Sequence, residues 1–366
     1  MNRLLKLNEY GQSYWLDNLT RKKITSGELK KRIEEQGLRG VTSNPTIFDK
    51  AIAKSQDYDT QIEELAKKGV DPLHIYDQLV IKDIQDACDV MRPVFDKTHG
   101  LDGYISLEVS PHLAHNPEET AQETRRLFKT VNRPNCLIKI PGTKEAIPVI
   151  EQMLYEGINI NITLLFSVKM YEQVANAYVS ALEKRVKENK PIDMIASVAS
   201  FFLSRIDVLV DKLLEQKQDA KNLLGKIAIA NAKMAYQSFK TIFQGKRWEE
   251  LAKKGAKVQR PLWASTSTKN PNYLDVMYVE PLIGKDTVNT MPDETIEAFA
   301  DHGKAAAQII EQDIDKAKED LNNLKKAGID LEAVTDQLTK EGIQKFIEPY
   351  DALLKTIQEK MHAFKK

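Results

Sequence analysis

Eight short apolar runs, separated in most cases by amphipathic stretches of helical period, constrain the fold of this chain more than any other feature. The runs cover residues 13–18, 40–44, 103–110, 136–141, 158–165, 194–200, 261–267 and 276–282. Strands that alternate with helices form parallel sheets, and eight such units predict an α/β fold of the (β/α)8 TIM-barrel type. Only about nine residues separate the last two runs, so we expect one outer helix to be missing or reduced to a loop there.

Polar capping residues mark where the predicted helices begin. A side-chain oxygen at this position accepts a hydrogen bond from a backbone N–H that the helix leaves free, and proline is favoured directly after it. The candidates are Thr25 with Glu28, Asn44, Asp71, Asn116, Thr143, Ser167, and Thr290 with Asp293. Residues 293–366 are helical and charged, without a further strand pattern. We therefore expect a barrel over about residues 13–292, covered by a C-terminal helical extension, with the chain 1–366 forming a single domain.

The balance of charges and the lack of long apolar runs exclude several classes of partner. Lys plus Arg and Asp plus Glu both number 53, so the formal net charge is zero. Binders of nucleic acid or of acidic membranes need a basic surface, and we expect neither partner. We also expect no secretory signal, and no run approaches the roughly 18 apolar residues of a membrane span. Two cysteines, Cys88 and Cys136, are too few for a disulfide framework, which favours a reducing, cytoplasmic compartment.

The run at residues 136–141 contains the residue on which the functional interpretation depends. Its sequence is Cys-Leu-Ile-Lys-Ile-Pro, so Lys139 lies in the middle of an apolar strand. Burial disfavours the charged form of an amine, and a neutral amine is the nucleophile that forms a Schiff base with a carbonyl substrate. A buried lysine can equally be one half of a structural ion pair. The position alone leaves both interpretations open.

Polar residues near the ends of the other strands favour the catalytic interpretation. In a barrel of this kind the chemistry lies at the carboxyl ends of the strands. The candidates there are Asp17, Asn44, Glu108, Lys139, Asn161, Thr163 and Ser200. Each could be structural, but so many polar groups at one barrel mouth would be costly to bury without partners or a substrate. Arg205, one turn into the helix after Ser200, is a candidate phosphate ligand.

Several motifs resemble those of transaldolases and occur in the same order. They are residues 14–18 (YWLDN), 40–48 (GVTSNPTIF), 106–110 (SLEVS), 138–143 (IKIPGT), 160–166 (INITLLF) and 199–205 (ASFFLSR). Residues 263–271 (WASTSTKNP) and 288–292 (VNTMP) resemble the longer bacterial branch of the family, which also occurs fused to glucose-6-phosphate isomerase. Several long motifs in register are a more specific signal than one isolated pattern.

The resemblance implies a barrel of the class I aldolase superfamily and a defined reaction. A dihydroxyacetone unit moves reversibly from sedoheptulose 7-phosphate to glyceraldehyde 3-phosphate, giving erythrose 4-phosphate and fructose 6-phosphate, in the non-oxidative pentose phosphate pathway. The partners are thus sugar phosphates, with no metal and no organic cofactor, and we expect a monomer or a homodimer.

The same resemblance implies individual roles. Lys139 would form the Schiff base, Asp17 would remove the C4 hydroxyl proton, and Glu108 would exchange protons through a water held by Thr163. Substrate binding would fall to Asn44, Asn161, Ser200 and Arg205. Many members carry a second phosphate-binding arginine in the loop after the seventh strand. Here Lys269 occupies that loop, and lysine is a point charge rather than a bidentate fork.

Three alternative functions fit the sequence less well. A metal-dependent aldolase would need a histidine cluster, and the one close pair, His112 and His115, is more simply explained by loop packing. A fructose-6-phosphate aldolase would be much shorter and would tend to have a tyrosine where Glu108 stands. A non-catalytic barrel that serves as a scaffold would have lost the lysine or the carboxylates, and all are present.

Overall fold

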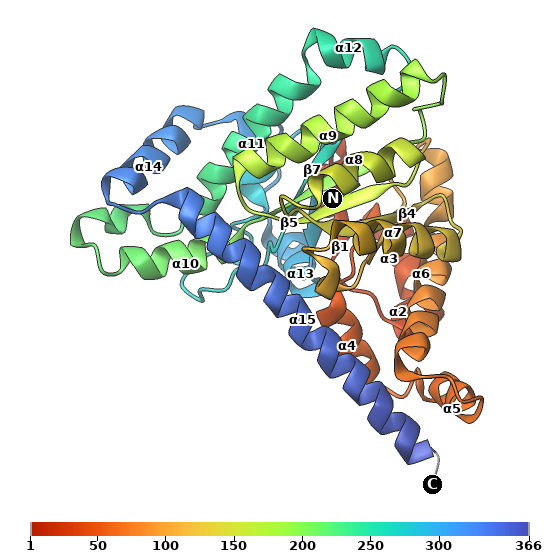
Figure 1. Ribbon diagram of the computed structural model, residues 1–366. Helices are drawn as coiled ribbons and strands as arrows, with labels where there is room; N and C mark the ends of the chain where they lie inside the picture. Colours follow the sequence, from red (N-terminus) through yellow and green to blue (C-terminus); the bar gives the residue numbers. More distant parts are fainter. Residues whose placement is uncertain (1, 365–366) are drawn as a thin grey trace.

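The computed structural model describes residues 2–364 and confirms the predicted barrel (Figure 1). Eight parallel strands follow one another around a closed sheet in chain order, and the first pairs with the last. The strands are β1 (Gln12–Leu16), β2 (Gly40–Val41), β3 (Tyr104–Glu108), β4 (Cys136–Pro141), β5 (Ile160–Leu165), β6 (Ser197–Phe202), β7 (Arg260–Ala264) and β8 (Thr287–Met291). Seven of them overlap the predicted runs, and β4 has the predicted bounds.

Helices surround this sheet, and in the described part of the chain none is long and apolar enough to cross a membrane. The α-helices are α1 (Arg3–Glu9), α2 (Arg21–Thr25), α3 (Glu28–Gln36), α4 (Pro45–Ala53), α5 (Asp59–Lys67), α6 (Pro72–Lys97), α7 (Pro117–Val131), α8 (Ile147–Glu156), α9 (Val168–Lys187), α10 (Ser204–Leu214), α11 (Ile227–Phe243), α12 (Lys246–Ala252), α13 (Asp293–His302), α14 (Ile314–Lys326) and α15 (Leu331–Phe364). The 3₁₀ helices are η1 (Pro111–Leu113), η2 (Gln218–Leu223), η3 (Glu280–Leu282) and η4 (Ile309–Glu311).

Four predicted helix caps are confirmed. In each case the side-chain oxygen accepts a hydrogen bond from a backbone N–H in the first turn of α4, α6, α7 or α9, which satisfies a donor that the helix leaves free. The capping residues are Asn44, Asp71, Asn116 and Ser167. Thr143 caps a turn instead, because its hydroxyl accepts from Ala146 N–H and α8 begins only at Ile147.

The predicted capping box of Thr25 and Glu28 is wrong. Thr20 caps the short helix α2, and Thr25 is the last residue of that helix. The next helix, α3, begins at Glu28 after Gly27, whose φ of 80° turns the chain sharply between the two helices. The sequence pattern contained two helices where one was expected.

The eighth strand was assigned to the wrong segment. Residues 276–282 form turns and the 3₁₀ helix η3, whereas β8 lies further along the chain. Apolar content indicates burial and does not by itself distinguish a strand from a packed turn. Thr290, predicted to cap a helix, is therefore inside β8. The connection over residues 265–286 contains no α-helix, so the missing outer helix is confirmed although the strand after it was misplaced.

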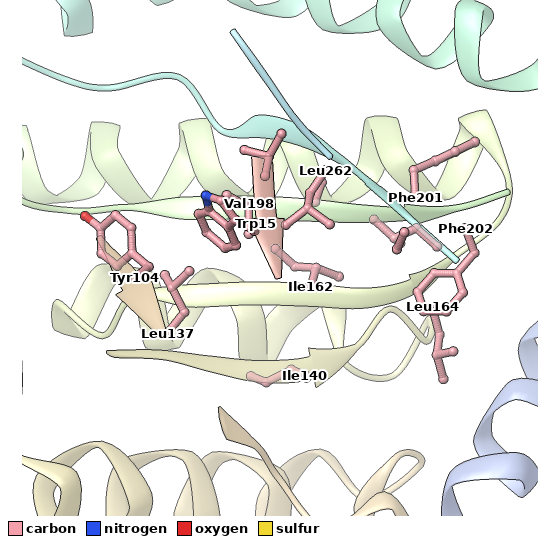
Figure 2. Close-up of a cluster of buried hydrophobic side chains, with 14 of the residues drawn as sticks. Trp15, Tyr104, Leu137, Ile140, Ile162, Leu164, Val198, Phe201, Phe202 and Leu262 are labelled. Carbon is pink, nitrogen blue, oxygen red and sulfur yellow. The ribbon is translucent and has the colours of Figure 1, made fainter. Parts of the chain in front are cut away.

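Large apolar side chains of the strands form a buried cluster (Figure 2). Tyr104 lies at one end of the cluster and Leu164 and Phe202 lie at the other. Trp15, between them, is fully buried, and burying a side chain of this kind contributes roughly 1.5–3 kcal/mol. Below this core Arg260 forms a buried ion pair with Asp102 at 2.8 Å. Packed layers therefore leave only one end of the barrel, where the strands end, for polar chemistry.

The last helix, α15, runs diagonally across the front of the molecule in Figure 1. It packs against α4, α5, α6 and α10 and against strand β5. One buried face runs along it at helical spacing, which explains why so long and charged a helix is held against the barrel. The residues of this face are Leu338, Gly342, Phe346, Tyr350, Leu353, Ile357 and Met361.

Candidate active site

A cavity of about 300 Å³ opens where the carboxyl ends of the strands converge. Seven of the nine predicted site residues line it: Asp17, Asn44, Lys139, Thr163, Ser200, Arg205 and Lys269. The other two, Glu108 and Asn161, do not line the cavity and are buried on the strands that flank β4. Residues brought together from six strand ends thus form one site, as expected of a barrel enzyme.

Lys139 is buried in the centre of this site, with 4% of its surface exposed. Its Nζ donates a hydrogen bond to the carbonyl oxygen of Ser43 at 2.9 Å and lies 3.3 Å from Oε2 of Glu108. Glu108 and Asn161 are the residues aligned with Lys139 on the two neighbouring strands. The register of three parallel strands therefore places a carboxylate and an amide on either side of the amine.

The carboxylate of Glu108 has an unusual environment. Neither of its oxygens accepts a well-formed hydrogen bond from the described residues, and its closest charged neighbour is Lys139. Burial raises the pKa of Glu108, and the positive charge of Lys139 opposes that shift. A buried carboxyl with a raised pKa beside an amine is suited to exchanging protons with it.

Asp17 is placed by the end of β1. Its backbone N–H donates to the carbonyl of Met291, and its Oδ1 accepts a hydrogen bond from the hydroxyl of Thr42 at 2.7 Å. That hydroxyl lies 2.6 Å from the hydroxyl of Thr290. Burial raises the pKa of Asp17, while the charge of Lys139 and the bond from Thr42 lower it. Sequence reasoning missed both threonines, although Thr42 directly follows strand β2.

Asn161 is connected to the cavity by a hydrogen bond with Ser200. The hydroxyl of Ser200 donates to Oδ1 of Asn161 at 2.6 Å, and the Asn161 amide nitrogen donates to the hydroxyl of Ser106 at 3.0 Å. Ser200 lines the cavity and Asn161 lies behind it. Asn44 lines the cavity directly, but its Oδ1 already caps α4, which leaves its amide nitrogen as the donor for a ligand.

Thr163 owes its position to a β-bulge in β5. The pairing with β6 shifts between Ile162 and Leu165, so two residues of β5 stand opposite Ser200 alone. Leu164, at the bulge, has a φ of 58°, which is strained for a leucine. The hydroxyl of Thr163 is buried and has no hydrogen-bond partner among the described residues, which leaves it free for a water or a ligand. Strict alternation in the sequence gave no sign of this bulge.

Three cationic side chains line the cavity in addition to Lys139. Arg205, near the start of α10, has its guanidinium 5.5 Å from the ring of Phe202, and its buried Nη1 has no partner among residues 2–364. Lys269 is exposed and donates to the hydroxyl of Ser267 at 2.5 Å. Lys50, on α4, was not predicted and also lines the cavity. An anionic group would find several positive charges here.

The histidine pair contributes nothing to this cavity. His112 is exposed and lies 2.7 Å from Asp351, and His115 is exposed and lies 3.5 Å from Glu145. Within the described residues no group of three or more His, Cys, Asp and Glu side chains could hold a metal ion. Both side chains are exposed and lie beside carboxylates of other segments, away from the cavity.

A closed parallel barrel with a lysine buried beside carboxylates at its carboxyl end is the arrangement of an aldolase-type enzyme. The chain belongs to the transaldolase/fructose-6-phosphate aldolase family, whose family model matches residues 14–357. The fold, the cavity and this match agree with one another.

The curated relatives indicate which of the two activities in the family name applies to this chain. A protein named transaldolase 2 from Nostoc punctiforme is 51% identical, over 98% of this chain and 98% of its own length. A transaldolase from Trichodesmium erythraeum is 50% identical over 98% of both chains, and one from Thiobacillus denitrificans is 45% identical over 98% of this chain and 100% of its own. Similarity of this extent identifies an enzyme with transaldolase activity, a transferase.

Proposed function

We propose that this cavity transfers a dihydroxyacetone unit from sedoheptulose 7-phosphate to glyceraldehyde 3-phosphate, with Lys139 as the nucleophile. The observation that carries the proposal is the pairing of a buried amine with a buried carboxylate, Glu108, at 3.3 Å. A lysine held this way can lose its proton to a neighbour without that proton passing through bulk water.

The first half of the reaction forms the Schiff base. Glu108 accepts a proton from Lys139, and the neutral amine then adds to the C2 carbonyl of the donor. One proton of the new C–N nitrogen moves to the carbonyl oxygen, which gives the carbinolamine. Glu108 returns a proton to the carbinolamine hydroxyl, which leaves as water, and the iminium results. The free hydroxyl of Thr163 can hold that water in the cavity. The raised pKa of Glu108 supports both steps, because a carboxyl that binds a proton more readily than usual can both accept and return one.

The second half breaks and remakes a carbon–carbon bond. Asp17 accepts the proton of the C4 hydroxyl, the C3–C4 bond breaks, and its electron pair forms the enamine on Lys139. The first aldehyde leaves, and the enamine carbon attacks the acceptor aldehyde, whose oxygen takes the proton back from Asp17. The hydrogen bond from Thr42 holds the carboxylate of Asp17 in the orientation that this transfer needs.

The remaining residues support a site for phosphorylated sugars. Arg205 and Lys269 offer charge to the phosphate, Ser200 offers a hydroxyl, and Asn44 offers an amide donor to the sugar. We propose that the chain is one functional unit, that it acts in the cytoplasm as a monomer or homodimer, and that neither nucleic acid nor a membrane is its partner. The unpaired thiols of Cys88 and Cys136 support a reducing compartment.

Borohydride trapping tests the proposal. Incubation with fructose 6-phosphate and borohydride should add a reduced dihydroxyacetone unit to Lys139, located by mass spectrometry, and Lys139→Met should remove the label. A label on another lysine would refute the assignment. A coupled assay with and without erythrose 4-phosphate then separates transfer from simple cleavage, because an aldolase releases free dihydroxyacetone without an acceptor.

A further inference from the structure

One side chain of the C-terminal helix lines the cavity with the strand-end residues. Phe346, on α15, is 4% exposed, and its ring centroid lies 5.9 Å from Nζ of Lys139 and 5.9 Å from Cζ of Arg205. The ring therefore stands over the position where a substrate joined to Lys139 would extend toward Arg205. Phe202 of β6 also lines this cavity. The ring of Phe346 comes instead from a helix more than two hundred residues after Lys139 in the chain.

A glycine one turn earlier brings the helix down to this depth. A Cβ atom on Gly342 would lie 2.9 Å from Cδ2 of Leu164 and 3.4 Å from Nη1 of Arg205. Glycine inside a helix is unfavourable by roughly 1 kcal/mol relative to alanine, so close approach is the physical reason for it here. Leu164 is the residue at the β-bulge that positions Thr163. The helix thus rests on the strained segment of the site itself.

Contacts on the other side of Phe346 hold α15 in place. Tyr350, the next turn of the same face, packs edge-on against Tyr76 of α6 with ring centroids 5.3 Å apart. Asp351 lies 2.7 Å from Nε2 of His112. Anchors on both sides of Phe346 make its ring a fixed wall of the cavity.

We propose that Phe346 is a positioning residue that shields the Lys139-bound enamine from water and so directs the three-carbon unit to the acceptor aldehyde. This inference rests on the proposed function. In the competing reaction the enamine carbon takes a proton from water, which gives an iminium and hydroxide. Water then adds to the iminium carbon, and the hydroxide takes up the proton that this water releases. The C–N bond breaks, and dihydroxyacetone leaves with the amine of Lys139 restored. An apolar ring over the adduct hinders both water-dependent steps.

The ratio of free dihydroxyacetone to transfer product measures this shielding. Fructose 6-phosphate and erythrose 4-phosphate serve as substrates for the wild type, Phe346→Ala and Phe346→Leu. We expect Phe346→Ala to raise the ratio severalfold and Phe346→Leu, which keeps apolar bulk, to raise it less. Leu353→Ala is the matched control, since Leu353 is fully buried on the same face of α15 and does not line the cavity. Its ratio should equal that of the wild type.

Gly342→Ala provides a second test that leaves the ring intact. The added methyl group should displace α15 or Leu164 and raise the ratio, although alanine favours the helix. An unchanged ratio in both Phe346 variants would overturn the inference, as would an equal rise in Leu353→Ala, which would indicate general loosening of the helix. Failure of the wild type to form transfer product or a trapped adduct would instead refute the proposed function, so the two failures are distinguishable. If Phe346→Ala does not fold, Phe346→Leu and Gly342→Ala still decide the outcome.

Discussion

Glu108 and Lys139 face each other across two neighbouring parallel strands, in register, with Oε2 and Nζ 3.3 Å apart. Both side chains are less than a tenth exposed. Taking two charges out of water is costly, and an ion pair in the interior is weak evidence for stability. The pair is better explained by proton exchange between the two groups, which the proposed Schiff-base chemistry requires.

Glu108→Gln should therefore impair adduct formation. Loss of a general acid–base typically costs about 10²–10⁴-fold in rate, and we expect that reduction in the rate of borohydride-trappable adduct. Burial raises the pKa of Glu108 above its usual value of 4.5, so the acidic limb of the wild-type rate profile should lie above pH 4.5. Rates of trapping measured across pH would show this limb, and Glu108→Gln should lack it. A limb that persists in the variant would assign it to another group.

Asp17→Asn should separate adduct formation from bond cleavage. The amide is isosteric and can still accept the hydrogen bond from Thr42, but it cannot take up the C4 hydroxyl proton. We expect the variant to trap fructose 6-phosphate on Lys139 at close to the wild-type extent while turnover falls by about 10²–10⁴-fold. The trapped adduct should keep all six carbons of the sugar. Near-normal turnover would show that another group removes the proton.

Features of the fold that depend on local interactions could be predicted from the sequence. Caps such as Asn44 and Asp71 were predictable because they act within a few residues of chain. Strand β4 was predictable because proline ends a clear apolar run. The bulge at Leu164 depends on pairing with a second strand, and the true β8 was hidden by a more apolar segment that packs as turns.

The site residue that could not be predicted from the sequence, Phe346, depends on long-range packing. Asp17, Glu108, Lys139 and Arg205 lie near strand ends, so topology alone brought them together. Phe346 could not be found this way, because its place depends on how the last helix crosses the barrel. The one local signal was Gly342, a glycine inside a helical pattern, which often marks a close approach.

Arg205→Ala should weaken the binding of phosphorylated substrates. Hydrogen bonds to charged groups contribute about 1.5–3 kcal/mol, which predicts a rise in KM for fructose 6-phosphate of about tenfold to a hundredfold. Lys269→Ala should have a smaller effect, because Lys269 is exposed. Steady-state kinetics of both variants would compare the two. An unchanged KM in Arg205→Ala would place the phosphate elsewhere, with Lys50 as the next candidate.

Asp102→Ala should destabilise the fold from the end of the barrel opposite the cavity. Asp102 and Arg260 form a buried ion pair at 2.8 Å, and removal of one partner leaves the other charge buried alone, which costs about 3–5 kcal/mol. Asp89→Ala, which breaks an exposed pair with Arg133, should cost at most about 1 kcal/mol. Urea unfolding would compare them. Equal losses of unfolding free energy in the two variants would show that burial does not determine how much the Asp102–Arg260 pair contributes to stability.

Asp207 should make the stability of the enzyme depend on pH between pH 3.8 and about pH 7. This buried carboxyl on α10 accepts hydrogen bonds from Ala228 N–H and from the hydroxyl of Tyr278, both at 2.8 Å, and burial raises its pKa from 3.8 to about 7. Nearby Asp211 adds to the rise. Because the folded state holds this proton more tightly than the unfolded state, stability is fully present below pH 3.8 and falls as pH rises to about 7.

The expected slope of this loss is about 1.4 kcal/mol per pH unit for one proton, before other groups are counted. Asp207→Asn keeps an acceptor for Ala228 and cannot ionise, so it should lose this component. Melting temperatures of the wild type and the variant, measured from below pH 3.8 to above pH 7, should converge at the lowest pH and separate up to about pH 7, with the variant more stable at high pH. Parallel curves would show that Asp207 keeps the same protonation state throughout this range.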